Sequence, residues 1–213
     1  MSLVIRNLSD QVADLVRDRI ISGSIPGDQA IRQDALAAEL GVSKIPLREA
    51  LTRLEQQGLV FSQANRGFFV RPLSTSEAEE VFALRLKLEP EATAAAALRA
   101  EPEDQQFATA TIETLEQVTD AHGAGVGAFN RAFHLALLRP CAQPVTLTFL
   151  ERLHVLSERY VRKHLEWLGR DDRANAEHRM IFDAWLARDE AAVIALSRVH
   201  IVKTLDDLRL QLG

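Results

Sequence analysis

Apolar residues recur at helical spacing along most of the chain. In the first such stretch they are Leu8, Val12, Leu15, Val16 and Ile20. This spacing predicts an amphipathic helix over residues 8–22. Turns rich in Gly and Pro separate it from a short second helix at about 33–40 and from a third that extends to about residue 57. Two β-rich runs at 59–62 and 68–71 then predict a hairpin.

From Ser74 onward the pattern is helical throughout, with no further strand signal. The breaks in periodicity predict helices at about 75–99, 103–121, 127–138, 143–168, 172–187 and 190–211. The sequence therefore predicts a mostly α protein with two domains. Residues 1–73 are expected to form a winged helix-turn-helix, and residues 74–213 an all-helical bundle.

The order helix, helix, Gly turn, helix, hairpin is that of a winged helix-turn-helix, and local residues agree with it. Small Ala37 lets the two helices approach, and Gly41 can take the positive φ needed between them. Ser43 is a candidate N-cap for the following helix. Lys44 and Arg48, one turn apart at its start, can face the major groove of DNA.

Composition narrows the classes of protein. The 213 residues are 47% hydrophobic and 26% charged, as in globular proteins. Apolar runs are too short for a membrane span, and charge at Arg6 and Asp10 argues against a signal peptide, so we expect a cytoplasmic protein without membrane contact. A single cysteine, Cys141, excludes an intramolecular disulfide and a multi-cysteine zinc site.

Charge is uneven along the chain, whose formal net charge is -5. Residues 1–72 carry nine Lys/Arg and eight Asp/Glu, whereas residues 73–213 carry 16 and 22. Within 43–71 five basic residues face two acidic ones, which could form a phosphate-facing surface. By charge alone, an ordinary solvated helix face is the simpler interpretation.

The stretch LAAELGVSKIPLREALTRLEQQGLV, followed by NRGFFV, resembles the DNA-binding domain of GntR-type bacterial transcriptional regulators. The resemblance covers about residues 5–72. It implies contacts to double-stranded operator DNA from the start of the third helix and from the wing tip in the minor groove. The residues so implied are Ser43, Lys44, Ile45, Arg48, Asn65, Arg66 and Gly67. A winged helix used only for protein contacts is the alternative.

Two departures from the family pattern affect recognition. Family members commonly have Arg-Thr or Arg-Ser where this chain has Lys44-Ile45, and some have Arg where it has Asp34. Lys lacks the bidentate guanine contact of Arg, while Ile can touch only a thymine methyl. Arg32, just before the second helix, can supply the phosphate contact that Asp34 cannot.

Histidines on separate helices of the second domain suggest a metal site. Asn130 and His134 share a helix face at i, i+4, and His178 and His200 lie on two later helices. In a bundle, three imidazoles and one amide oxygen can converge on a buried ion. Core histidines without an ion are the alternative, and the pattern does not decide the role of His154.

The second domain is similar to the FCD effector domain of the FadR subfamily, over about residues 76–209. The resemblance implies a divalent metal held by Asn130, His134, His178 and His200 in an effector cavity. Many members have Asp where this chain has Asn130. A neutral oxygen ligand disfavours hard cations such as Mg²⁺ and Ca²⁺ and leaves Zn²⁺ or Ni²⁺ as candidates. A small carboxylate is the expected effector, with Arg85 as its anchor.

These observations together predict a ligand-responsive transcriptional regulator that is not an enzyme. It is expected to be a homodimeric repressor that reads a palindromic operator. Two alternatives remain open at this point. One is a metal-dependent hydrolase with Glu177 as base, although that residue lies about 100° around the helix from His178. The other is a purely structural metal.

Overall fold

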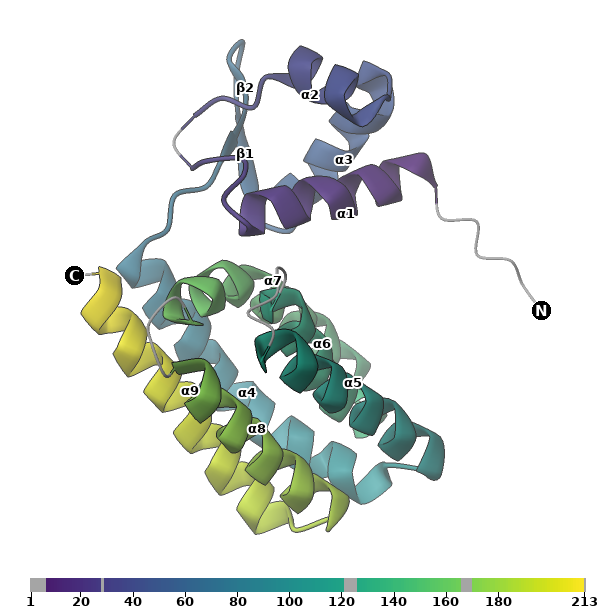
Figure 1. Cartoon of the computed structure of the whole chain (residues 1–213), viewed down its shortest axis with the longest axis vertical. Coiled ribbons are helices and arrows are strands. Elements are labelled where there is room, and N and C mark those ends of the chain that lie inside the picture. Colours follow the sequence, from purple (N-terminus) through teal and green to yellow (C-terminus); the bar gives the residue numbers. More distant parts are fainter. Residues whose placement is uncertain (1–6, 28, 121–125, 166–169, 213) are drawn as a thin grey trace. The chain divides into compact units, whose positions relative to one another are not determined.

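The structure is a computed structural model that describes residues 7–27, 29–120, 126–165 and 170–212 (Figure 1). Side chains at 120, 162–165, 170 and 171 are not described. The elements are α1 Leu8–Ile21, α2 Gln33–Leu40, α3 Lys44–Gln56, β1 Val60–Gln63, β2 Gly67–Val70, α4 Thr75–Arg99, α5 Pro102–Asp120, α6 Val126–Leu138, the 3-10 helix η1 Arg139–Cys141, α7 Pro144–Leu165, α8 Arg170–Leu186 and α9 Glu190–Leu212. The predicted mostly helical fold is confirmed, with helix boundaries within a few residues. The break expected at 122–127 falls on residues outside the described ones as far as residue 125, and α6 begins at Val126. The break expected at Gly169, His122, for which the sequence favours a solvated position, and the side chain of His164, whose role it leaves open, also lie outside the described residues.

Chain packing gives two compact units, Met1–Leu73 and Ser74–Gly213. In the first unit α1 and α2 pack on α3, and the hairpin of β1 and β2 follows (Figure 1). The core-facing side of α1 contains Val12, Val16 and Ile20, whereas Leu8 and Leu15 are half-exposed. The sequence pattern therefore found the helix but placed its apolar face too broadly.

The turn between α2 and α3 depends on Gly41. Its φ of 65° is in the left-handed region, and its N–H donates to the Ala38 carbonyl. Ser43 takes the extended backbone conformation of an N-cap, but its hydroxyl makes no capping hydrogen bond. Ser43 therefore occupies the predicted N-cap position of α3, but within the described residues its side chain does not form the expected capping hydrogen bond.

Strands β1 and β2 pair antiparallel, with Gln63 opposite Gly67. The tip contains Asn65 at φ 60° and Gly67 at φ 89°, both in the left-handed region. Asn tolerates that region better than most residues because its side chain can bond locally. These conformations reverse the chain within a few residues and produce a narrow wing.

In the second unit, long helices form a bundle (Figure 1), and their core contains alanine, branched aliphatic and aromatic residues. Helix α4 packs along α9 and also contacts α7, while α5 packs on α6 and α8. Ala94 and Ala97 of α4 are buried, and small side chains let helices approach closely. Trp185 of α8 is fully buried and donates from Nε1 to the Leu137 carbonyl at 3.1 Å.

A helix that spans a bilayer needs about 20 consecutive, mostly apolar residues, and the described helices can be set against this requirement. None of them combines the length and the apolar character needed to cross a membrane.

Candidate nucleic-acid interface and metal centre

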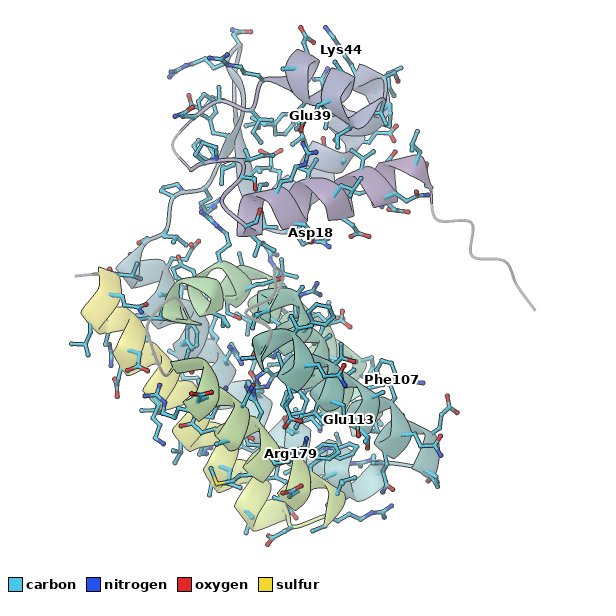
Figure 2. The ribbon with its side chains drawn as sticks, in the orientation of Figure 1. Asp18, Glu39, Lys44, Phe107, Glu113 and Arg179 are labelled. Atoms are coloured by element: carbon cyan, nitrogen blue, oxygen red, sulfur yellow. The ribbon has the colours of Figure 1, made fainter. Side chains whose placement is uncertain are left out.

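The N-terminal end of α3 presents its side chains to solvent. Lys44, Ile45 and Arg48 are all exposed, and Ile45 keeps 71% of its surface accessible. Figure 2 shows Lys44 directed away from the body of this unit. A single exposed apolar side chain is ordinary on a protein surface, so Ile45 shows that this helix start is accessible to a partner and does not by itself identify one.

The wing and the start of α2 supply the other expected DNA contacts. Arg32, Asn65 and Arg66 are exposed, and Gly67 is half-buried. The Arg66 guanidinium lies 5.5 Å from the Phe69 ring centroid. A hollow of about 510 Å³ lies between α3 and the wing, and Arg48 lines it. Arg48 also lines a second hollow of about 500 Å³ along α3.

Acidic residues of this unit neutralise several of its basic ones. Asp10 pairs with Arg53, and the Asp34 carboxylate lies 2.6 Å from the Lys44 ammonium. Within the described ranges, the guanidinium of Arg48 has no such acidic partner. Among the basic side chains of α3, Lys44 and Arg53 each pair with a carboxylate, whereas Arg48 pairs with none in the described residues.

The second unit brings three of the histidines together. His134 of α6, His178 of α8 and His200 of α9 each offer a ring nitrogen within 4.8 Å of the others. All three are buried. Asn130 is buried one turn before His134 and lines the same small cavity as His134, His200 and Arg85. The four residues implied as ligands thus come from three helices to one region.

The charge state of His134 suits a metal ligand. Burial lowers the pKa of His134 to about 3, although the hydrogen bond to Glu89 acts in the opposite direction. His134 is therefore neutral near pH 7, with a lone pair available to an ion. Its Nε2 is buried and has no hydrogen-bond partner among the described residues. Such an orphaned nitrogen beside two other imidazoles fits Zn²⁺ or Ni²⁺.

A buried ion pair lies next to this cluster. Arg85 donates from Nε to Glu89 Oε2 at 2.7 Å and from Nη2 to Oε1 at 3.0 Å. Its Nη1 donates to Ser157 Oγ at 3.3 Å. Burial alone would raise the pKa of Glu89, but the Arg85 guanidinium and the nearby His154 and His134 hold it well below its usual range. The side chain expected to anchor an effector is thus bound bidentately by a carboxylate of the same helix.

His154 of α7 belongs to the same cluster. The sequence pattern leaves its position, inside or outside the bundle, open. Its ring stacks on that of His134 with centroids 5.3 Å apart, and its Nε2 lies 3.3 Å from Glu89 Oε2. Burial lowers the pKa of His154. Its helical spacing from the buried Leu150 and Val161 is the signal that could have placed it inside.

Comparisons with known proteins agree with this architecture. Residues 8–70 match the model of the gntR family of bacterial regulatory proteins, and residues 80–203 match that of the FCD domain. The Nta operon transcriptional regulator of Aminobacter aminovorans is 34% identical over 189 residues, which cover 86% of this chain and 85% of the relative. The transcriptional repressor GlaR of Escherichia coli is 28% identical, over 88% of this chain and 89% of GlaR.

A solved structure, that of E. coli McbR/YncC, covers 98% of this chain and 100% of its own with a TM-score of 0.84. At 21% identity it shows a shared fold. The families and relatives are transcriptional regulators and not enzymes. The hydrolase alternative therefore finds no support.

Proposed function

This chain belongs to the gntR family of bacterial regulatory proteins and carries an FCD domain, and we propose that it is a repressor controlled by a small carboxylate at a metal-containing cavity. Regulators of this family bind operator DNA and are typically dimers. The relative GlaR is itself named a repressor. The observation that carries the sensing part of the proposal is the convergence of His134, His178 and His200.

For the DNA-binding unit, we propose that two copies of α3 enter successive major grooves of a palindromic operator. The half-sites would then be about 34 Å apart, one helical turn. Arg48 and Lys44 would contact bases or phosphates, and exposed Ile45 would meet a thymine methyl. The wing tip, formed by Asn65, Arg66 and Gly67, would enter the minor groove. The DNA phosphate backbone would be contacted by Ser43 and Arg32.

For the sensing unit, we propose that His134, His178, His200 and Asn130 hold one divalent ion. Three imidazoles and one amide oxygen favour Zn²⁺ or Ni²⁺ over Mg²⁺ or Ca²⁺. Such an ion supplies a cationic centre with positions open to a carboxylate.

The proposed effector must change the cavity in order to bind. The cavity lined by Arg85, Asn130 and His200 has a volume of about 10 Å³, which is room for a single water-sized group. A carboxylic acid needs more space, so the side chains that line the cavity must move apart to admit it. Three of the five guanidinium N–H groups of Arg85 donate to Glu89 and Ser157, which leaves donors for a ligand carboxylate. A ligand that binds the opened form more tightly shifts the protein toward it, which is the requirement for a response.

The test is metal analysis of gently purified full-length protein, together with a thermal-shift screen of small carboxylic acids. We expect about one divalent ion per chain and stabilisation by particular acids, with both lost in His178→Ala. His154→Ala is the matched control, because it removes another buried imidazole of the same cluster that is not a proposed ligand.

An absence of metal from the wild-type protein, or equal metal content in His178→Ala, would contradict the metal centre. A bound ion whose chelation lowers the melting temperature, with no acid affecting either stability or DNA binding, would indicate a structural metal and overturn the sensing proposal.

A further inference from the structure

Glu177 lies on α8 directly before the proposed ligand His178, yet both of its carboxylate oxygens are engaged by α9. Oε2 lies 2.8 Å from His200 Nδ1, and Oε1 accepts from Lys203 Nζ at 2.8 Å. Successive side chains on a helix diverge by about 100°, so His178 can face the cluster while Glu177 reaches α9. Glu177 therefore contacts Nδ1 of His200, a proposed ligand on the neighbouring helix.

This contact fixes which nitrogen of His200 carries the proton. The second carboxylate oxygen of Glu177 accepts from the Lys203 ammonium at 2.8 Å, so the group lies between two donors in the geometry of a carboxylate. A carboxylate only accepts hydrogen bonds, so at 2.8 Å the imidazole of His200 donates to it through Nδ1–H. In the neutral ring, the lone pair then resides on Nε2.

Glu89 stands in the same relation to His134. Its Oε1 lies 3.4 Å from His134 Nδ1, and the opposite nitrogen, Nε2, is the buried atom without a hydrogen-bond partner in the described ranges. Arg85 grips both oxygens of Glu89 and so fixes the carboxylate in place. Thus Glu177 of α8 contacts Nδ1 of His200, and Glu89 of α4 lies near Nδ1 of His134.

We propose that Glu177 and Glu89 are the positioning residues of the metal centre. Each accepts from the Nδ1–H of one imidazole, so that His200 and His134 both present Nε2 to the ion. The inference rests on the proposed function, because it needs a metal at this cluster. It adds the reason that the rings already have the tautomer and orientation that an ion requires.

Glu177 is the better residue to test. Glu89 neutralises the buried Arg85, so its removal would disturb the core. Glu177 does not neutralise a buried cation. Its Oε1 accepts a hydrogen bond from Lys203, whose side chain is 48% exposed. Arg173 Nε also lies 3.7 Å from that oxygen. Lys203→Met removes the 2.8 Å hydrogen bond to Oε1 while leaving Arg173 and His200 in place, which makes it the matched control.

The experiment titrates Co²⁺ and Ni²⁺ into full-length, metal-stripped protein, with the visible absorption of Co²⁺ as a readout of geometry. We expect Glu177→Leu to weaken binding by about 10- to 100-fold and to alter the Co²⁺ spectrum. Glu177→Gln, whose amide oxygen can still accept from Nδ1–H, should stay much closer to wild type. Lys203→Met should bind as wild type does.

Wild-type affinity and spectrum in a folded Glu177→Leu variant would overturn the positioning role while leaving the metal centre intact. If wild-type protein binds neither ion, both proposals fall together. A test on unmutated protein guards against misfolding of the variant. Long-range ¹H–¹⁵N correlation spectra of metal-stripped protein should show the His200 proton on Nδ1, and a proton on Nε2 would refute the proposal.

Discussion

Replacement of Arg85 by Met tests how the cluster is held together. Arg85 and Glu89 are about as buried as charged residues become, with side-chain exposures of 3% and 4%. Met matches the aliphatic part of Arg but removes the charge and three hydrogen bonds. The Glu89 carboxylate would then remain in the core beside the imidazoles of His134 and His154.

The expected loss of stability follows from the difference between removing one partner of a buried ion pair and replacing both partners. Removal of one partner leaves an uncompensated buried charge and costs about 3–5 kcal/mol. Replacement of both partners by neutral groups costs far less, because no charge stays behind. At roughly 3 °C per kcal/mol for a protein of this size, Arg85→Met should lower the melting temperature by about 10 °C. Arg85→Met/Glu89→Gln should recover more than half of that loss.

The assay is thermal and urea unfolding followed by circular dichroism at 222 nm, in EDTA so that no ion masks the effect. Arg198→Met is the control, because the Arg198–Glu91 pair has side-chain exposures of 49% and 51% and should contribute less than about 1 kcal/mol. A loss below about 1 kcal/mol for Arg85→Met, or a double variant no more stable than the single one, would refute this reasoning.

Four further predictions concern other parts of the chain. Lys44→Ala should weaken DNA binding across sequences and reduce the slope of log K against log salt by about 1, measured by fluorescence anisotropy. Asp34→Asn should instead tighten non-specific DNA binding in the same assay, because it frees the Lys44 ammonium and removes a negative charge; unchanged affinity would count against the pair. Gly41→Ala should cost about 1–2 kcal/mol in urea unfolding, since φ is 65° there, and Gly41→Asn should cost less. Burial, and then the hydrogen bond to Glu77, raise the pKa of Tyr160, so wild-type stability should fall as pH rises above about 10, and Tyr160→Phe should lack that decline.

The sequence predicted the helices well because their apolar periodicity is long and regular. It also found the turn at Gly41, where only a residue that tolerates positive φ fits. The finer placement of α1 failed, with Leu15 half-exposed, because a periodic stripe does not say which of its edges the partner helix α3 covers.

The candidate site was recoverable only in part. The spacing of Asn130 and His134 puts them on one helix face, but the convergence of His178 and His200 depends on how helices pack, which local pattern does not encode. Arg85 and Glu89 are four residues apart, yet the sequence could not show that their ion pair is buried. The contacts that bring His154 and Glu177 to the cluster arise only where helices pack together.

The gathering of the proposed ligands from α6, α8 and α9 also bears on how this unit folds and survives. No stretch of unfolded chain holds the three imidazoles close, so an ion finds its site only after those helices have docked. Such an ion would leave the refolding rate almost unchanged and would slow unfolding. Because it binds the native state alone, its stabilising effect would grow with the ratio of free ion to Kd. Metal supply would then set the time for which the bundle resists proteolysis, as well as its readiness for an effector.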